Sequence, residues 1–222
     1  GTRTTPALFI RGSNKSHELC LVDGKQINSA SLGSTSYQFK DPSQIERIEI
    51  VRGAKSSIYG SDSVGWVIQI FTKKGDFKPS TIVSTEVGSN VLKRTAVATR
   101  GAYNQLRYSI DLSYLETDGI DVLKDDSQQN RDSDGYKNFS INTNFGYTFD
   151  NGVDVGLSFL ESHSRIYLDG SSYPDRDSFS DSIIQNIGFS VSAPLRDWWL
   201  SKISMGRSMD DIDDTNGIDG SH

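Results

Sequence analysis

Long runs of alternating apolar and polar residues are the feature that most constrains the fold of this chain. In residues 106–114 the even positions are Leu, Tyr, Ile, Leu and Tyr, whereas the odd positions are Arg, Ser, Asp and Ser. Similar runs occupy residues 139–149, 153–159, 187–193 and 199–205, with two weaker ones near 80–88 and 94–103. Because successive side chains of a β-strand point to opposite faces, the pattern predicts about seven antiparallel strands with one apolar and one polar face.

The connections between these strands alternate between short and long. Asp150-Asn151-Gly152 predicts a tight hairpin turn, and Pro194-Leu195-Arg196-Asp197 predicts a second short turn. Long polar loops are expected at about residues 117–135 and 164–180, and a third from about Met209. Short turns at one edge and long loops at the other are typical of an outer-membrane barrel. A soluble β-sandwich is the alternative, but its strands usually run to about 5–6 residues, whereas we expect roughly 10–14 here.

Aromatic residues near the predicted strand ends fit the interfacial girdles of such a barrel. They are Tyr114, Tyr136, Tyr147, Phe149, Trp198 and Trp199. About seven strands cannot close a transmembrane barrel, since the smallest have about 8. The chain begins with Gly1 and ends in Asp219-Gly220-Ser221-His222, inside what reads as a long loop. We therefore expect a piece of a longer barrel.

Composition excludes several other classes. Hydrophobic residues make up 35% of the 222, and no apolar run approaches the ~20 residues of a transmembrane helix. The net charge of −6 argues against nucleic acid as a partner. The single cysteine, Cys20, lies in an apolar run and is expected to be a buried packing residue. His17, His163 and His222 are far apart, and the chain has no nucleophile elbow or phosphate-binding loop, so we expect no enzyme.

The first part of the chain has a different character. A strand over residues 45–52, a glycine-punctuated turn and a return strand over 66–71 precede the alternating runs. The stretch IERIEIVRGAKSSIYGSDSVGWVIQIFTKKG (45–75) resembles the C-terminal part of the plug domain of TonB-dependent outer-membrane receptors. LFIRGSNKSHELCLVDGKQIN (8–28) also resembles this plug and is most similar to the cobalamin transporters.

The resemblance implies a mostly β fold in two parts. Residues 1–77 would be the C-terminal part of a plug domain, and residues 78–222 the N-terminal hairpins of a transmembrane barrel of about 22 strands, of which about seven are present. The expected location is the outer membrane of a Gram-negative bacterium. Trp66 and Gln69 depart from the small residue and the asparagine usual in the family, and Trp66 predicts local repacking.

The same resemblance implies a function and partners. The parent protein would import cobalamin or a related corrinoid without covalent chemistry, surrounded by outer-membrane lipid. A TonB-type energy-coupling protein would drive the transport, although its binding segment is not part of this stretch. The alternatives are an iron-siderophore receptor, which the acidic loops disfavour, and a non-transporting surface protein or degenerate barrel remnant.

Within the first part of the chain we expect structural roles for most of the conspicuous residues. Asp23-Gly24 is interpreted as a turn. Arg11, Glu46, Arg47 and Arg52 are predicted to pair with charges on the inner wall of the barrel.

A small, polar loop over residues 28–36 is the candidate substrate-binding segment. Its hydroxyls and amides, with those of two upstream residues, suit a neutral, amide-rich ligand; a bland solvent loop is the alternative. The candidate substrate-binding residues are Ser13, Asn14, Asn28, Ser29, Ser31, Ser34 and Ser36.

The two long loops are rich in aspartate. Carboxylates at i and i+2, as in Asp132-Ser133-Asp134-Gly135, can reach one hard cation where a glycine turns the chain, although the spacing is not that of an EF-hand. Cobalamin transporters bind calcium through aspartates in such loops, so the resemblance implies a loop-bound calcium ion here. The implied ligands are Asp121, Asp132 and Asp134 in the first loop, and Asp169, Asp175 and Asp177 in the second. Solvated, mutually repelling acidic loops are the alternative.

Overall fold

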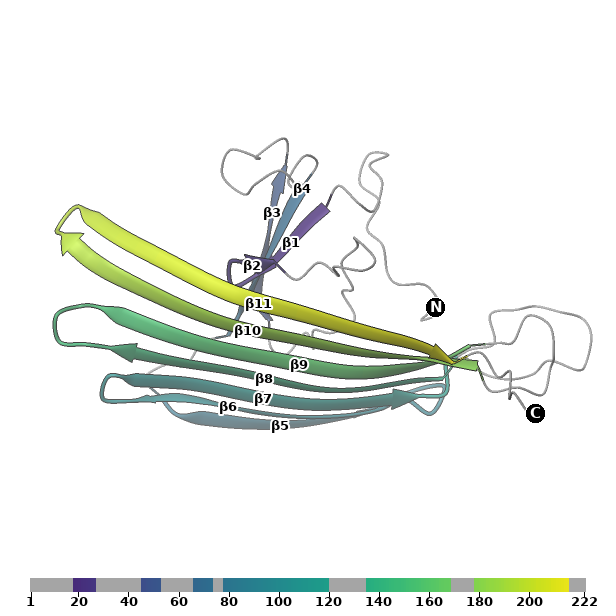
Figure 1. Cartoon of the computed structure of the whole chain (residues 1–222). Coiled ribbons are helices and arrows are strands. Elements are labelled where there is room, and N and C mark those ends of the chain that lie inside the picture. Colours follow the sequence, from purple (N-terminus) through teal and green to yellow (C-terminus); the bar gives the residue numbers. More distant parts are fainter. Residues whose placement is uncertain are drawn as a thin grey trace, which may run out of the picture.

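The computed structural model of the chain describes residues 18–26, 45–52, 66–73, 78–119, 135–168 and 178–215. All regular elements in these ranges are β-strands, and they form two separate sheets of four and seven strands (Figure 1). A helix long and apolar enough to cross a membrane is absent from the described residues.

The small sheet contains β1 (Glu18–Val22), β2 (Lys25–Gln26), β3 (Ile45–Arg52) and β4 (Trp66–Thr72), in the order β2-β1-β4-β3. β1 and β4 are parallel neighbours in its centre, flanked by antiparallel partners. A central strand covered on both faces needs a continuous apolar run, and Leu19, Cys20, Leu21 and Val22 are all buried. The predicted packing role of Cys20 is confirmed, because its side chain is completely buried in this core.

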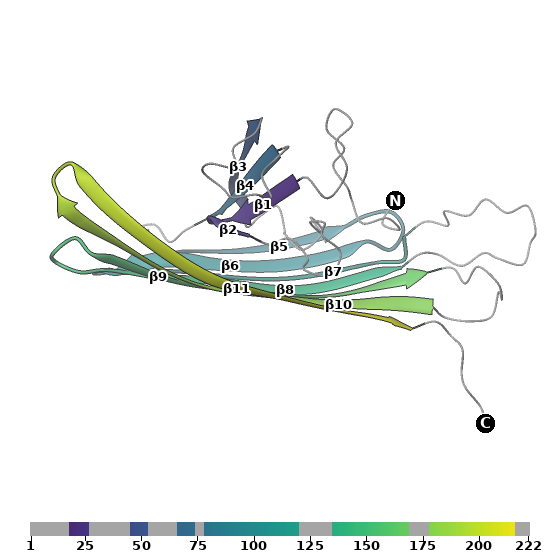
Figure 2. The same ribbon diagram turned by 45° about the horizontal axis from the view of Figure 1, so that its top comes forward.

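The long sheet is a meander in which each strand pairs with the next in the chain. Its strands are β5 (Ser80–Val87), β6 (Lys93–Tyr103), β7 (Leu106–Thr117), β8 (Tyr136–Thr148), β9 (Asp154–Leu168), β10 (Ser178–Arg196) and β11 (Trp199–Thr215). All neighbours are antiparallel, which confirms the predicted seven-stranded antiparallel sheet. The sheet is curved, and the small sheet lies over one of its faces in both views (Figures 1 and 2).

Burial in the long sheet is the reverse of that in a soluble protein. On β7, Ser109 and Asp111 are 0% and 2% exposed, whereas Leu112 and Tyr114 are 38% and 42% exposed. The same holds on β8, where Ser140 and Asn142 are buried and Phe139 and Phe145 are exposed. An apolar outer face and a polar covered face suit a sheet that meets lipid outside and a filled, polar interior inside. This pattern excludes the soluble sandwich.

Several predicted strand ends were wrong in the half of the sheet that carries the long loops. The loop predicted at residues 164–180 is shorter, since β9 continues to Leu168 and β10 begins at Ser178, and β11 continues beyond Met209 to Thr215. Consequently β10 has 19 residues and β11 has 17, more than the expected length. In these stretches both faces carry polar side chains, so alternation disappears from the sequence although the hydrogen-bond ladder continues.

The short turns were predicted with mixed success. The turn at Asp150-Asn151-Gly152 is confirmed, with Gly152 at a φ of 80° and its N–H donating to the Phe149 carbonyl at 2.9 Å. The turn predicted at residues 194–197 was misplaced, because β10 runs through Arg196 and pairs there with Trp199. The register shifts between Pro194 and Arg196, which accommodates a proline that cannot donate to the ladder.

One predicted girdle residue points the other way. Tyr136 is only 7% exposed and shares its face with the buried Asn138 and Ser140, so it belongs to the inner wall. The other five aromatic residues of the predicted girdle are exposed: Tyr114, Tyr147, Phe149, Trp198 and Trp199.

Candidate functional site

The place where the small sheet meets the long sheet is the candidate functional site. Thr72, the last residue of β4, is completely buried there. Its backbone N–H donates to Asp23 Oδ1 at 3.0 Å, and its hydroxyl donates to Asp23 Oδ2 at 2.5 Å. Asp23 lies in the β1–β2 turn, and its own N–H donates to the Ile70 carbonyl at 2.9 Å. These bonds fix the turn to the end of β4.

A hydrogen bond crosses from the long sheet to this junction. Asn144 on β8 donates its Nδ2 to the Thr72 hydroxyl at 3.4 Å. Beside it lies a cavity of about 20 Å³, lined by Val22 and Asp23 from the small sheet and by Asn142, Asn144 and Asn186 from the wall. Asn142 is 3% exposed, and its Nδ2 has no hydrogen-bond partner among the described residues. A cavity of this size has room for one water, so the seam between the sheets can be hydrated.

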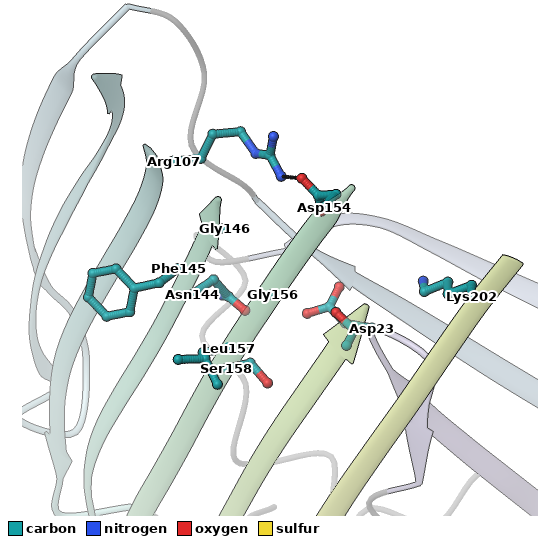
Figure 3. Close-up of a pocket in the computed structure, with 11 residues that line it drawn as sticks. Asp23, Arg107, Asn144, Phe145, Gly146, Asp154, Gly156, Leu157, Ser158 and Lys202 are labelled. Atoms are coloured by element: carbon teal, nitrogen blue, oxygen red, sulfur yellow. Dashed lines mark hydrogen bonds and ion pairs between the residues drawn. The ribbon is translucent and has the colours of Figure 1, made fainter. Parts of the chain in front are cut away.

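A second cavity, of about 100 Å³, adjoins the same junction (Figure 3). Asp23 projects into it from the small sheet and Lys202 projects from β11 on the wall. At another side of the cavity the Arg107 guanidinium pairs with Asp154, and it also donates to the Thr148 hydroxyl at 2.6 Å. The cavity therefore carries one carboxylate from each sheet and two cations from the long sheet.

Glycines on the wall make room for this cavity. A Cβ at Gly146 would lie 2.9 Å from Arg107 Nη2, and a Cβ at Gly156 would lie 2.7 Å from Ser190 Oγ. Real Cβ atoms do not approach so closely, so a side chain at either position would displace its neighbour. The two glycines thus let Arg107 and Ser190 lie flat against the wall.

The rest of the buried wall consists of small polar groups in mutual contact. Asp111 accepts hydrogen bonds from Arg100 Nη2 at 3.1 Å and from the Ser109 hydroxyl at 3.0 Å. The Ser113 and Ser140 hydroxyls lie 2.7 Å apart. Such a surface offers donors and acceptors to a passing polar solute or to water.

The predicted site residues cannot be compared with this geometry. All seven candidate substrate-binding residues and all six candidate calcium ligands lie outside the described residues: Ser13, Asn14, Asn28, Ser29, Ser31, Ser34, Ser36, Asp121, Asp132, Asp134, Asp169, Asp175 and Asp177. Within the described ranges, no group of three or more His, Cys, Asp or Glu side chains could hold a metal ion.

The predicted pairing of plug charges with the inner wall was wrong for Arg47. Its guanidinium contacts carboxylates of its own strand, Glu49 at 2.8 Å and Glu46 at 3.3 Å, and lies 3.8 Å from the centre of the Phe71 ring. The hydrogen bond to Glu49 is the main cause of the raised pKa of Arg47. Arg11 and the Arg52 side chain lie outside the described residues, as does the Trp66 side chain.

Sequence reasoning interpreted Asp23 correctly as a turn residue but missed its bonds to Thr72. It also missed Asn144 and Lys202, which occupy ordinary polar positions of alternating strands. Only the φ of 50° at Asp23 distinguishes it locally, and this conformation is common for Asp and Asn in turns.

A small sheet seated on the polar, buried face of a meander whose outer face is apolar defines a plugged outer-membrane β-barrel. Residues 1–67 match the TonB-dependent receptor plug domain family. Solved structures with a similar fold include the siderophore receptor PirA from Acinetobacter baumannii (21% identity, TM-score 0.73, covering 90% of this chain and 33% of that one). The ferric-catecholate import receptor Fiu from E. coli K12 is also similar (14% identity, TM-score 0.74, covering 96% of this chain and 35% of that one). The ferric yersiniabactin uptake receptor FyuA from Yersinia pestis is similar as well (16% identity, TM-score 0.72, covering 89% of this chain and 32% of that one).

The chain therefore has the fold of a TonB-dependent receptor, with plug strands β1–β4 and seven strands of the barrel. This fold places it in the outer membrane of a Gram-negative bacterium. The chain spans about a third of the length of the structures that it matches.

Proposed function

We propose that this chain forms part of an outer-membrane active transporter that imports a metal complex of the iron-siderophore type. The observation that carries the proposal is that the small sheet packs on the polar, buried face of the long sheet. In this proposal β1–β4 obstruct the lumen, β5–β11 form part of the wall, and a TonB-type energy-coupling protein supplies the work of displacement.

The polar contacts between the small sheet and the long sheet suit a plug that must move during transport. The contact from Asn144 to Thr72 is a long neutral hydrogen bond, and two polar cavities lie beside it. A neutral hydrogen bond contributes about 0.5–1.5 kcal/mol net, and water can replace it when the surfaces separate. An apolar interface of the same area between the two sheets would resist separation more strongly.

The siderophore class comes first because the similar structures are named as siderophore, ferric-catecholate and ferric yersiniabactin receptors. Our sequence interpretation ranked the corrinoid first, and the comparisons favour its alternative instead. Cobalamin or a related corrinoid is the second candidate, supported by the resemblance of residues 8–28 and by the acidic loops.

In both cases the ligand would meet the segment 28–36 and the loops 118–135 and 169–177. Under the corrinoid alternative, calcium would be held by Asp121, Asp132 and Asp134, together with Asp169 and either Asp175 or Asp177. If corrinoid binding and its calcium dependence were unchanged by Asp132→Ala with Asp134→Ala, the calcium site would be wrong. The proposed transport involves no covalent step, and no residue is given a catalytic role.

Binding by the purified intact receptor tests the ligand class. A ferric catecholate, a ferric phenolate siderophore and cyanocobalamin are titrated separately, with calcium and with a chelator. We expect saturable binding of one ferric siderophore, independent of calcium. Saturable, calcium-dependent binding of cyanocobalamin alone would favour the second candidate. Binding of none of the three would favour the non-transporting surface protein or remnant.

A further inference from the structure

A patch of small side chains occupies the inner face of the long sheet on β8–β11. The strand register aligns it as two neighbouring rows, and each row takes one residue from each of the four strands. The patch consists of four glycines, three serines and one asparagine. The first row is Gly146, Gly156, Ser190 and Ser204, and the second is Asn144, Ser158, Gly188 and Gly206. We call these residues the small-residue patch.

Longer side chains border the patch on the side of β6 and β7. The first row continues there as Arg107 and Ala102, and the second as Ser109 and Arg100. Both arginines form ion pairs with carboxylates of the long sheet. The shortest inward-facing side chains in this part of the described wall are therefore concentrated on β8–β11.

Two cavities adjoin the patch on the side of the small sheet. The cavity of about 100 Å³ is lined by five residues of the patch, and the cavity of about 20 Å³ is lined by two. Asp23 of the β1–β2 turn lines both cavities, and β2 contacts β11. The turn therefore lies over the patch without filling the space between them (Figure 3).

An unsatisfied buried donor lies beside the patch. Asn142 is the inward-facing residue of β8 next to Asn144, on the side of the long loops, and it lines the smaller cavity. Asn142 is 3% exposed, and no described residue accepts a hydrogen bond from its Nδ2. An unpaired buried donor costs about 1–3 kcal/mol, so a polar guest that accepts from it would be stabilised there. The space beside the patch is thus suited to polar molecules.

Side-chain size and hydrogen-bond strength both favour passage of a polar solute on this side of the wall. Glycine and serine have the smallest side chains here, so a solute displaces little protein when it passes them. Serine hydroxyls and asparagine amides can replace the water around the solute. Each neutral hydrogen bond is worth only about 0.5–1.5 kcal/mol net, so the surface does not retain what it contacts.

We propose that the imported metal complex passes the plug along the small-residue patch. This inference rests on the proposed function and adds the side of the barrel on which the path opens. The β1–β2 turn separates from β8–β11, and the hydroxyls and amides of the patch hydrogen-bond in turn to the complex or to its water. The path leads from Asn142 toward Lys202 and the short turns, which are periplasmic in outer-membrane barrels.

The test changes the size of a side chain on the patch and measures uptake by energised cells that express the intact receptor. The probes are a radiolabelled ferric catecholate and a radiolabelled ferric phenolate siderophore, tested separately. We expect Ser190→Phe to lower the uptake rate per assembled receptor by about tenfold or more, because the ring overfills the path. The Kd for the same siderophore at the cell surface should stay that of wild type. Ser190→Ala adds no volume and should transport nearly as well as wild type.

Ala102→Phe is the matched control, because Ala102 lies in the first row on the inner face of β6 but outside the patch. It should leave uptake unchanged. Surface binding of the siderophore reports the amount of assembled receptor in each variant. If Ser190→Phe does not assemble, Ser204→Phe carries the same prediction, since Ser204 pairs with Ser190 in the same row.

The outcomes separate this inference from the proposed function. Wild-type uptake in the assembled phenylalanine variants of the patch, or an equal loss in Ala102→Phe, would overturn the path alone. A loss of surface affinity in Ser190→Phe that accounts for its loss of uptake would do the same, because the residue would then act in binding. No uptake of either siderophore by wild type would overturn the proposed import of a ferric siderophore, and the path with it.

Discussion

Asp23 joins the β1–β2 turn to the junction between the two sheets. Its backbone φ of 50° is unusual for a residue other than glycine, and both carboxylate oxygens accept hydrogen bonds from Thr72. A buried Thr72 N–H that lost this acceptor would be left without a partner. The turn thereby couples β1 and β2 to the last residue before the connection to the long sheet.

We expect Asp23→Ala to weaken this junction by about 1–3 kcal/mol, because it leaves two buried donors of Thr72 unsatisfied. The measurement is amide hydrogen exchange at residues 70–73 in the intact receptor, which should become faster. Asp150→Ala is a suitable control, since Asp150 lies in an exposed hairpin turn and accepts a hydrogen bond from Gln105 at 2.9 Å. Equal protection in Asp23→Ala and wild type would show that the carboxylate does not hold the junction.

Gly156, like Gly146, is a wall position without room for a side chain. A Cβ there would lie 2.7 Å from Ser190 Oγ, so Gly156→Ala should destabilise the barrel by about 1–3 kcal/mol through overpacking. Removing the hydroxyl as well, in Gly156→Ala with Ser190→Ala, should recover most of the loss. Denaturant unfolding of the assembled receptor measures both. A double variant as unstable as the single one would contradict this contact.

At the scale of elements, alternation predicted the central parts of the strands but not all of their ends. The apolar positions of β7 and β8 were read correctly because lipid outside and polar filling inside impose opposite preferences on alternate residues. Alternation does not predict the C-terminal part of β9, since His163 and Arg165 on the outer face are as polar as Ser162 and Ser164 on the inner face. The hydrogen bonds of the β-ladder continue through this part, but they cannot be recognised from the hydropathy of the sequence.

The junction was even less predictable from the sequence. The bond from Asn144 to Thr72 joins residues 72 positions apart, and neither residue type marks such a contact. The Asp23-Gly24 turn, by contrast, was predictable from local turn chemistry. Local turn chemistry therefore predicted the turn, whereas the contact between the sheets depends on how two sheets far apart in the sequence pack together.

On the outer face of β6 and β7, we expect the cost of a buried charge to depend on its depth in the membrane. Ile110→Arg places a cation in the middle of the apolar outer face of β7 and should cost about 2–4 kcal/mol, whereas Thr95→Arg, close to the end of β6 that pairs with Glu116, should cost about 0–1 kcal/mol. Both residues lie on the outer face, since Thr95 pairs with Tyr114 and Ile110 pairs with Thr99. Reversible unfolding in detergent or lipid gives the two values. Equal costs would contradict the placement of this face in lipid.

At the scale of the whole molecule, the described part of the long sheet is an open meander. β5 and β11 each have one strand neighbour, and its outer face exposes large apolar side chains such as Leu157 and Ile203. Unpaired edges and apolar surface of this kind promote association in water. We expect the 222-residue chain, refolded alone in aqueous buffer, to elute as aggregates in size-exclusion chromatography. A monomer that unfolds cooperatively would contradict this expectation.

The transport proposal is itself a statement about the whole molecule, because it requires the small sheet to leave a polar wall when energy is supplied. Uptake of a radiolabelled ferric siderophore by energised cells that express the intact receptor is its most direct test. We predict accumulation above that of cells lacking the receptor, and loss of the accumulation when the TonB-type coupling protein is deleted or the proton gradient is collapsed. Accumulation that survives both treatments, or the absence of uptake for every ferric siderophore and for cobalamin, would contradict an active transporter.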